Sequence, residues 1–82
     1  MNNLKEKARY LEPVMRIGKN GLTEGTIIEI KKQLKKKKLI KIKFLRAFLG
    51  NNDKKQAAKE ISEKTESIII DQVGFVVVLW RR

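Results

Sequence analysis

Residues 17–23 read Ile-Gly-Lys-Asn-Gly-Leu-Thr, and the rest of the chain is organised around this stretch. Two glycines three positions apart permit positive φ angles, so backbone N–H groups can converge on a phosphate without a Cβ in the way. Lys19 adds a charge at the tip. Thr23 is a good N-cap for a following helix, whose positive dipole end would lie near the same phosphate. We interpret the stretch as a phosphate-binding loop, with an ordinary glycine-rich turn as the alternative.

The composition predicts a single basic domain spanning residues 1–82. A chain of 82 residues can bury one modest core and is too short for two. Its 20 Lys and Arg against 9 Asp and Glu give a formal net charge of +11. So strong an excess in a short chain indicates an anionic partner, for which nucleic acid is the first expectation.

Several function classes are excluded by residues that the sequence lacks. It has no Cys and no His, which excludes Cys–His nucleophiles, imidazole bases and the usual zinc sites. No cofactor is indicated, and we do not expect an enzyme. The longest apolar run, residues 75–80, is far shorter than the roughly 20 residues that cross a bilayer. We therefore expect a soluble cytoplasmic protein that is a monomer when free.

The first half of the chain predicts two helices separated by a short strand. Asn3 can cap the first helix, with Glu6 three positions later, and Pro13 ends it. Residues 14–17 then form a strand that leads into the glycine loop. A second helix runs from Thr23 to about residue 37, because Ile27, Ile30 and Leu34 recur at helical spacing.

The second half predicts a strand, a helix and a hairpin. Residues 39–44 alternate apolar side chains with Lys41 and Lys43, as in a strand buried on one face. Residues 45–52 allow either a strand extension or a loop, and we leave them unassigned. Asp53 can cap a third helix that ends near residue 64. Residues 67–71 and 75–80, joined by 72–74, indicate an antiparallel hairpin that is covered on both faces.

The predicted order is α-β-α-β-α-β-β, which gives an α/β fold. We expect a four-stranded mixed sheet with the two crossover helices on one face and the N-terminal helix on the other. The glycine loop would then lie at the carboxyl end of a strand, where ligands commonly bind such sheets.

A concentration of lysines follows the loop. Residues 31–43 contain eight lysines and no acid, divided between a helix and the outward face of a strand. Such a run is often only a solvated surface, but unscreened like charges destabilise the compact state unless an anion neutralises them. Four of the five aromatic residues fall in patterns that indicate core. We therefore expect recognition of RNA backbone and shape, with base stacking as a minor contribution.

The chain resembles a known family over nearly its whole length. The segments that carry the resemblance are Pro13-Val14, residues 17–25, residues 39–43, Val73-Gly74 and Leu79-Trp80-Arg81. They are similar to the CRM domain, the chloroplast RNA splicing and ribosome maturation domain of YhbY-like proteins. The resemblance implies a fold like the C-terminal domain of translation initiation factor three. It also implies RNA binding, by a free-standing domain associated with precursor large ribosomal subunits.

The function expected from the sequence is therefore RNA binding, with ribosomal RNA or a pre-ribosomal large subunit as partner. A KH-like nucleic-acid module and an intron-splicing cofactor are the alternatives. A KH domain would need a helix before the loop, against which Pro13 argues. The candidate RNA-binding residues are Gly18, Lys19, Asn20 and Gly21 of the loop, together with Arg16, Lys31, Lys32, Lys35, Lys41 and Lys43.

Overall fold

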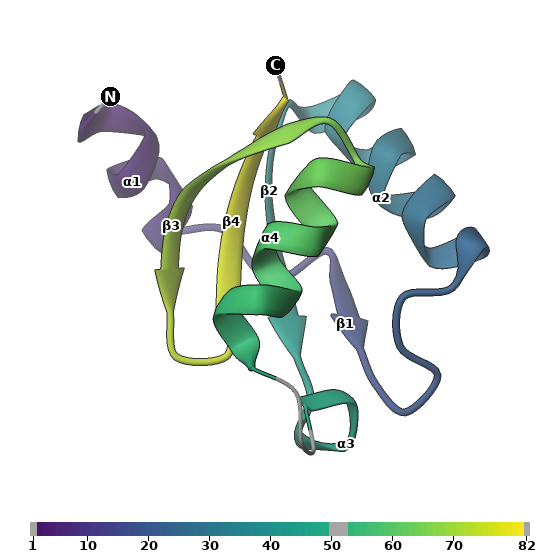
Figure 1. The fold of residues 1–82 in the computed structure, drawn as a ribbon. Coiled ribbons are helices and arrows are strands. Elements are labelled where there is room, and N and C mark those ends of the chain that lie inside the picture. Colours follow the sequence, from purple (N-terminus) through teal and green to yellow (C-terminus); the bar gives the residue numbers. More distant parts are fainter. Residues whose placement is uncertain (1, 50–52, 82) are drawn as a thin grey trace.

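The computed structural model describes residues 2–49 and 53–81, and its elements follow the predicted order with one addition. The addition is α3, a short helix in the segment that the sequence left unassigned (Figure 1). The elements are α1 (Asn2–Arg9), β1 (Met15–Ile17), α2 (Glu24–Lys37), β2 (Leu39–Phe44), α3 (Arg46–Leu49), α4 (Lys54–Lys64), β3 (Ser67–Val73) and β4 (Val76–Arg81).

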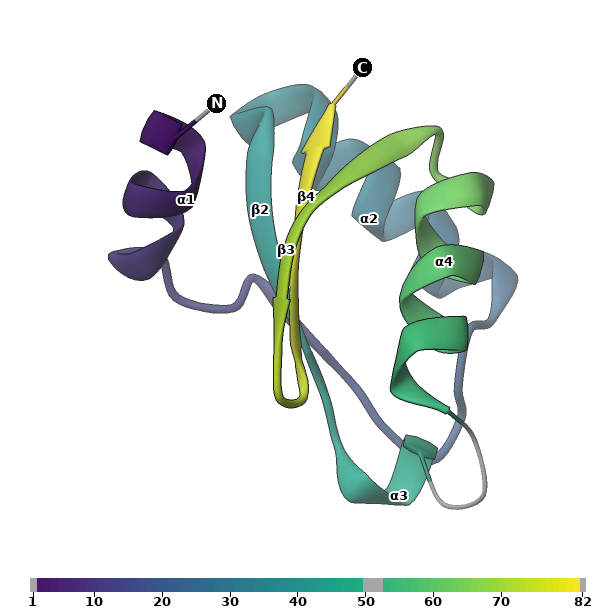
Figure 2. The same ribbon diagram turned by 60° about the vertical axis from the view of Figure 1, so that its left-hand side comes forward.

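The four strands of the described residues form one mixed sheet in the order β1-β2-β4-β3. β1 runs parallel to β2, and the other two pairs are antiparallel. Figure 2 shows α2 and α4 on one side of the sheet and α1 on the other. α2 contacts β2 and β4, and α4 contacts β3, whereas α1 contacts β2 and β3. The predicted fold class and the placement of the helices are confirmed.

The core lies between the sheet and the two crossover helices. Strand alternation turns Ile17, Ile42 and Phe44 into it, and all three are almost completely buried. α2 contributes Ile30 and Leu34, as the helical spacing predicted, whereas Ile28 is 51% exposed. The remaining members of the buried cluster are Ile40, Ala57, Ala58, Ile61, Val77 and Leu79. The same alternation directs Arg16, Lys41 and Lys43 to the opposite face.

Side-chain caps fix the starts of two helices. The Thr23 hydroxyl accepts a hydrogen bond from the Thr26 backbone N–H at 3.1 Å, so Thr23 caps α2 as predicted. Asp53 caps α4, accepting from the Lys55 N–H at 2.9 Å. The prediction for the first helix was wrong, because Asn3 lies inside α1 instead of capping it.

The hairpin differs from its prediction in two respects. Val73 pairs with Val76, so the turn is Gly74-Phe75. β3 begins at the predicted residue and runs two residues further, and β4 is displaced by one residue. Gly74 has a φ of +58°, which suits the first turn residue of a tight hairpin. β4 is covered on both faces, with Val77, Val78 and Leu79 buried. β3 is not, because it is the edge strand and leaves Ile68 39% exposed.

Candidate nucleic-acid interface

The glycine stretch forms a tight turn between β1 and α2. The Gly21 N–H donates a hydrogen bond to the Gly18 carbonyl oxygen at 2.9 Å, which closes the turn. Lys19 and Asn20 occupy its tip, and both are exposed. The element before Gly18 is the strand β1, as predicted, and not the helix that a KH-like reading requires. Two side chains able to contact a ligand are thus presented at the carboxyl end of a strand.

Glycine suits the two positions for different reasons. Gly21 has a φ of +69°, in the left-handed region that other residues rarely adopt. Gly18 does not have a positive φ, so that part of the prediction was wrong. A Cβ added at Gly18 would instead lie 3.3 Å from Cδ1 of Leu45. At position 18 the constraint is thus the approach of the Leu45 side chain, which would have to shift by a few tenths of an ångström to admit a Cβ.

Residues 45–48, in and just before α3, pack against the glycine turn. The Leu45 N–H donates to the Ile17 carbonyl oxygen at 2.9 Å and so ties the ends of β1 and β2 together. Phe48 packs against the core, with its ring 5.5 Å from that of Phe44. Sequence reasoning missed this support. The three-residue spacing of Leu45 and Phe48, about one helical turn, was the available signal.

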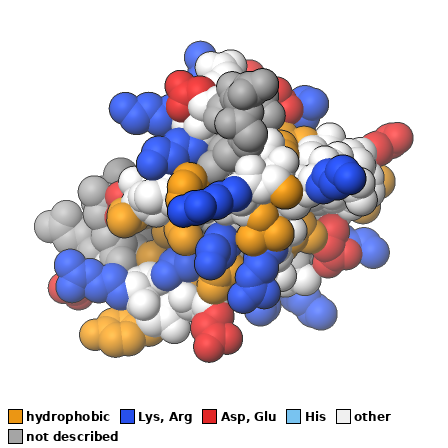
Figure 3. Space-filling model, turned by 90° about the horizontal axis from the view of Figure 1, so that it is seen from below, with side chains coloured by type: hydrophobic (Ala, Val, Ile, Leu, Met, Phe, Trp, Pro, Cys, Tyr) orange, Lys and Arg blue, Asp and Glu red, His pale blue; other side chains and the backbone are white. Residues whose placement is uncertain are grey.

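Cations surround the turn on the face of the sheet that α1 leaves open. Arg16 and Lys43 are cross-strand partners in the β1–β2 register, and both are exposed. Arg46, which is not among the predicted residues, is exposed at the start of α3. Figure 3 views this end of the molecule and shows Lys and Arg side chains interspersed with hydrophobic ones, with acids mostly toward the outline. We call Arg16, Lys19, Asn20, Lys43 and Arg46 the loop surface.

The ten predicted residues do not form one patch. Six of them, Arg16, Gly18, Lys19, Asn20, Gly21 and Lys43, lie at the loop. Lys41 points to the same face as Lys43 but is half-buried, lining a cavity of about 290 Å³ between α1 and the sheet. The exposed residues Lys31, Lys32 and Lys35 lie on α2, which covers the opposite face. At 1.5 Å per residue, Lys35 is roughly 18 Å along the helix from Thr23.

The N-terminus of α2 is partly neutralised by the chain itself. Thr23 occupies the Thr26 N–H, and Glu24 places a carboxylate in the first turn. Both compete with an incoming phosphate for the positive end of the helix. The α2 N-terminus is therefore less attractive to an anion than an uncapped helix end without an acidic residue.

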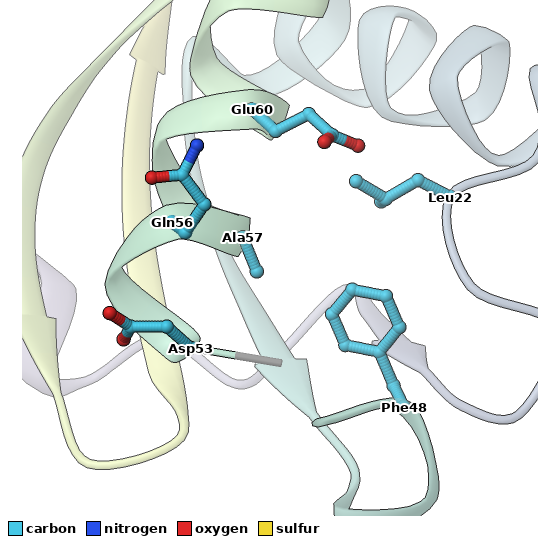
Figure 4. Close-up of a pocket in the computed structure, with 6 residues that line it drawn as sticks. All are labelled: Leu22, Phe48, Asp53, Gln56, Ala57 and Glu60. Carbon is cyan, nitrogen blue, oxygen red and sulfur yellow. The ribbon is translucent and has the colours of Figure 1, made fainter. Parts of the chain in front are cut away.

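A cavity of about 240 Å³ lies on the other side of the loop. Figure 4 shows Leu22 and the Phe48 ring on one side of it and α4 on the other. On that side the residues lining it include two with carboxylates, Asp53 at the N-cap of α4 and Glu60 within the helix. Their charge repels phosphate, so the cavity marks a boundary of the loop surface and not an extension of it.

The described residues show no constellation suited to catalysis. Asp53 is the N-cap of α4, and an Asp71 carboxylate oxygen accepts a hydrogen bond from the Gln72 N–H at 2.9 Å. Within residues 2–49 and 53–81, no group of three or more acidic, His or Cys side chains could hold a metal ion. In the same part of the chain, none of the helices has the length and apolarity needed to cross a membrane.

Comparisons with known proteins agree on one family. The family model described as the CRS1 / YhbY (CRM) domain matches residues 1–81. A probable RNA-binding protein of Methanocaldococcus jannaschii is 38% identical over 78 residues, covering 95% of this chain and 58% of that protein. An RNA-binding protein of Haemophilus influenzae is 36% identical over 78 residues, covering 95% of this chain and 77% of its own. Neither relative is named as an enzyme.

The fold also has a counterpart among solved structures. The solution structure of a Staphylococcus aureus protein superposes with a TM-score of 0.79 and is 30% identical in sequence. The match covers 99% of this chain and 82% of the other. The likeness therefore extends to the whole arrangement of sheet and helices.

Proposed function

Because the chain belongs to the CRS1/YhbY (CRM) domain family, we propose that it binds RNA through the loop surface and acts on ribosomal RNA during assembly of the large subunit. The names of its relatives support RNA as the ligand. The ribosomal target rests on the resemblance to free-standing CRM domains. The proposal takes the protein to be a binding module without catalytic activity.

One observation carries the assignment of the site. The turn closed by Gly18 and Gly21 stands at the end of the strand pair in which Arg16 and Lys43 are cross-strand neighbours. Two cations on adjacent strands and a third, Lys19, at the turn can contact successive phosphates of a backbone that passes over the loop. Backbone contacts of this kind position RNA without reading its sequence.

Two matched triple variants test this site against the α2 lysines. One changes Arg16, Lys19 and Lys43 to Gln, and the other changes Lys31, Lys32 and Lys35 to Gln. All six side chains are exposed, and each variant removes three positive charges. Both should therefore fold like the native protein, which circular dichroism and urea unfolding would verify. Any difference between them in RNA affinity then reports the position of the charges and not their number.

Affinity for a folded fragment of large-subunit ribosomal RNA is measured by fluorescence anisotropy across a salt series. The logarithm of the association constant falls linearly with the logarithm of the salt concentration, and each lost phosphate contact makes this slope less steep by about 0.9. We therefore expect the slope of the loop-surface variant to be less steep than that of the native protein by about 3. We expect the α2 variant to keep most of the native slope. Equal losses in the two variants would show that the loop surface is not the site. A native protein that fails to bind RNA at low salt would refute the function itself.

The ribosomal target needs a separate experiment. Epitope-tagged protein is followed through sucrose-gradient sedimentation of cell extracts. We expect it to co-sediment with precursors of the large subunit, and the loop-surface variant to remain near the top of the gradient. Native protein found only at the top, although it binds RNA in vitro, would refute the ribosomal assignment and leave RNA binding standing.

A further inference from the structure

A second surface able to hold part of an RNA lies at the opposite end of the sheet from the loop. It is a groove with a volume of about 700 Å³, bounded by α1 and by the junction of α2 with β2. Leu39 and Trp80, cross-strand partners on β2 and β4, line it together with Leu11. The loop lies beside the end of β2, whereas Leu39 begins this strand (Figure 1). The groove, which Leu39 lines, is therefore at the opposite end of β2 from the loop.

Two aromatic side chains line the groove. Trp80 is half-buried, and Tyr10 is 87% exposed. Tyr10 therefore contributes almost nothing to the core, and its ring is free to take up a flat ligand. An exposed aromatic side chain that the fold does not use is the kind of surface on which nucleic-acid bases stack.

The charges around these rings have one sign. Lys7, Lys37 and Lys38 line the groove, and none of the described residues that line it is acidic. The groove thus combines aromatic and aliphatic walls with three ammonium groups. That combination complements a nucleotide, which has a flat apolar base and a negative phosphate.

One of the lysines is held in an unusual backbone conformation. Lys38 has a φ of +67° although it is not a glycine. Two hydrogen bonds hold it there: its N–H donates to the Leu34 carbonyl oxygen at 2.8 Å, and its carbonyl oxygen accepts from the Arg81 N–H at 2.8 Å. Strained positions of this kind often occur at binding sites. Here the strain fixes a lysine at the rim, next to the residue that pairs with Trp80.

We propose that this groove takes an unpaired nucleotide of the same RNA whose backbone lies on the loop surface. The base stacks on Tyr10 and Trp80, and its phosphate is held by Lys37 and Lys38. This inference rests on the proposed function and narrows it, because it specifies RNA with a single-stranded segment beside a structured one. The longest dimension of the protein is 33 Å, so one RNA can reach both surfaces.

Tryptophan fluorescence provides a direct test, because Trp80 is the only tryptophan in the sequence. Two RNA hairpins are compared, one blunt and one with a single-stranded tail of adenosines. Binding is followed by anisotropy of a label in the hairpin loop, and stacking by quenching of Trp80. We expect both RNAs to bind, but only the tailed one to quench Trp80 and to bind about tenfold more tightly.

Tyr10 supplies the matched variants, since a side chain so exposed can be changed without affecting the core. Tyr10→Ala should abolish the advantage of the tailed RNA and leave the blunt hairpin unaffected. Tyr10→Phe keeps the ring and should retain that advantage. If the tail changes neither affinity nor Trp80 fluorescence while the blunt hairpin binds, the inference fails and the proposed function stands. If neither RNA binds, the proposed function fails.

An acidic peptide is the competing occupant. Poly-glutamate is titrated at the same salt concentration, and Trp80 fluorescence is followed again. We expect weak binding that leaves the emission nearly unchanged, because the peptide has no ring to stack. Quenching as strong as that by the tailed RNA, at equal or lower concentration, would overturn the assignment of the groove to a nucleotide.

Discussion

The Phe48 ring lies beside Gly21 of the glycine turn. A Cβ placed on Gly21 would stand 3.6 Å from two carbons of the Phe48 ring, so the ring lies directly behind the turn. Phe48 in turn packs on the buried ring of Phe44. The Phe48 ring thus connects the glycine turn to the core.

Substituting Gly21 should strain the loop without creating a clash. The distance of 3.6 Å to Phe48 leaves room for a methyl group, but the φ of +69° disfavours any residue with a Cβ. We expect Gly21→Ala to lower the free energy of unfolding by about 1–2 kcal/mol, measured by urea denaturation. The loop should also lose affinity for RNA.

Gly25 provides the control for that variant. It lies in the first turn of α2, and a Cβ there would meet only Thr23 Oγ1, at 3.9 Å. Gly25→Ala should therefore be neutral or stabilising by up to about 1 kcal/mol. If both substitutions had the same effect on stability, the positive φ of Gly21 would not be what limits that position.

Removing the ring of Phe48 should loosen the turn as well as the core. Phe48 is half-buried, so we expect Phe48→Ala to cost about 2–3 kcal/mol, less than at a fully buried site. The Gly21 amide, which donates to the Gly18 carbonyl oxygen, should then exchange faster with solvent by NMR. Phe48→Leu should restore most of the protection. Unchanged exchange at Gly21 in the Ala variant would show that Phe48 does not support the loop.

Local patterns in the sequence were enough to place most elements. The alternation in residues 39–44 and the Thr23 cap are properties of neighbouring residues, and both appear as predicted. For α3 the only local signal was the three-residue spacing of Leu45 and Phe48, and it says nothing of what the helix does. Its role depends on contacts of Leu45 and Phe48 with Gly18 and Gly21, which lie far back in the chain. Only the folded structure brings these two segments together.

In the candidate site too, what depends on contacts between distant segments could not be predicted from neighbouring residues. Lysines that are neighbours in the sequence suggested one patch. Lys35, however, lies on α2, which packs on one face of the sheet, whereas the side chain of Lys43 points from β2 to the other face. A helix and the outward face of the strand after it cannot share a surface when the helix packs on the inward face. Arg46 was not predicted as part of the loop surface, because its position depends on α3, which the sequence left unassigned.

The cap of α2 makes a separate prediction. Thr23→Ala removes the acceptor of the Thr26 N–H and should lower the free energy of unfolding by about 1 kcal/mol, measured by urea denaturation. Thr23→Asp restores an acceptor and adds a charge that suits the helix dipole, so it should be as stable as the native protein. Equal stability of the Ala and native proteins would mean that water replaces the cap at no cost.

Salt should stabilise the free protein. On α2, Lys32 and Lys36 are four residues apart and exposed, as are Lys31 and Lys35, and like charges at this spacing repel by about 0.2–0.5 kcal/mol a pair. We expect the free energy of unfolding to rise by about 0.4–1 kcal/mol when salt screens these two pairs. Lys32→Glu converts one repulsive pair into an attractive one, so this variant should respond less to salt. A decrease in native stability on adding salt would contradict the prediction.

Lys38 should show opposite effects on stability and on binding. Its φ of +67° is unfavourable for lysine and readily adopted by glycine, so Lys38→Gly should raise the free energy of unfolding by about 1 kcal/mol in urea. The same change removes an ammonium group from the groove and should weaken binding of the tailed hairpin. The blunt hairpin should bind as before.

Glu66 is the matched control, because it too has a positive φ, of +55°, and is exposed, but it does not line the groove. Glu66→Gly should also raise stability by about 1 kcal/mol, and it should leave the affinity for the tailed hairpin unchanged. The two variants thus separate relief of backbone strain from loss of a binding group. A Lys38→Gly protein that gains stability and still binds the tailed hairpin like the native protein would show that the strain at Lys38 serves no role in the groove.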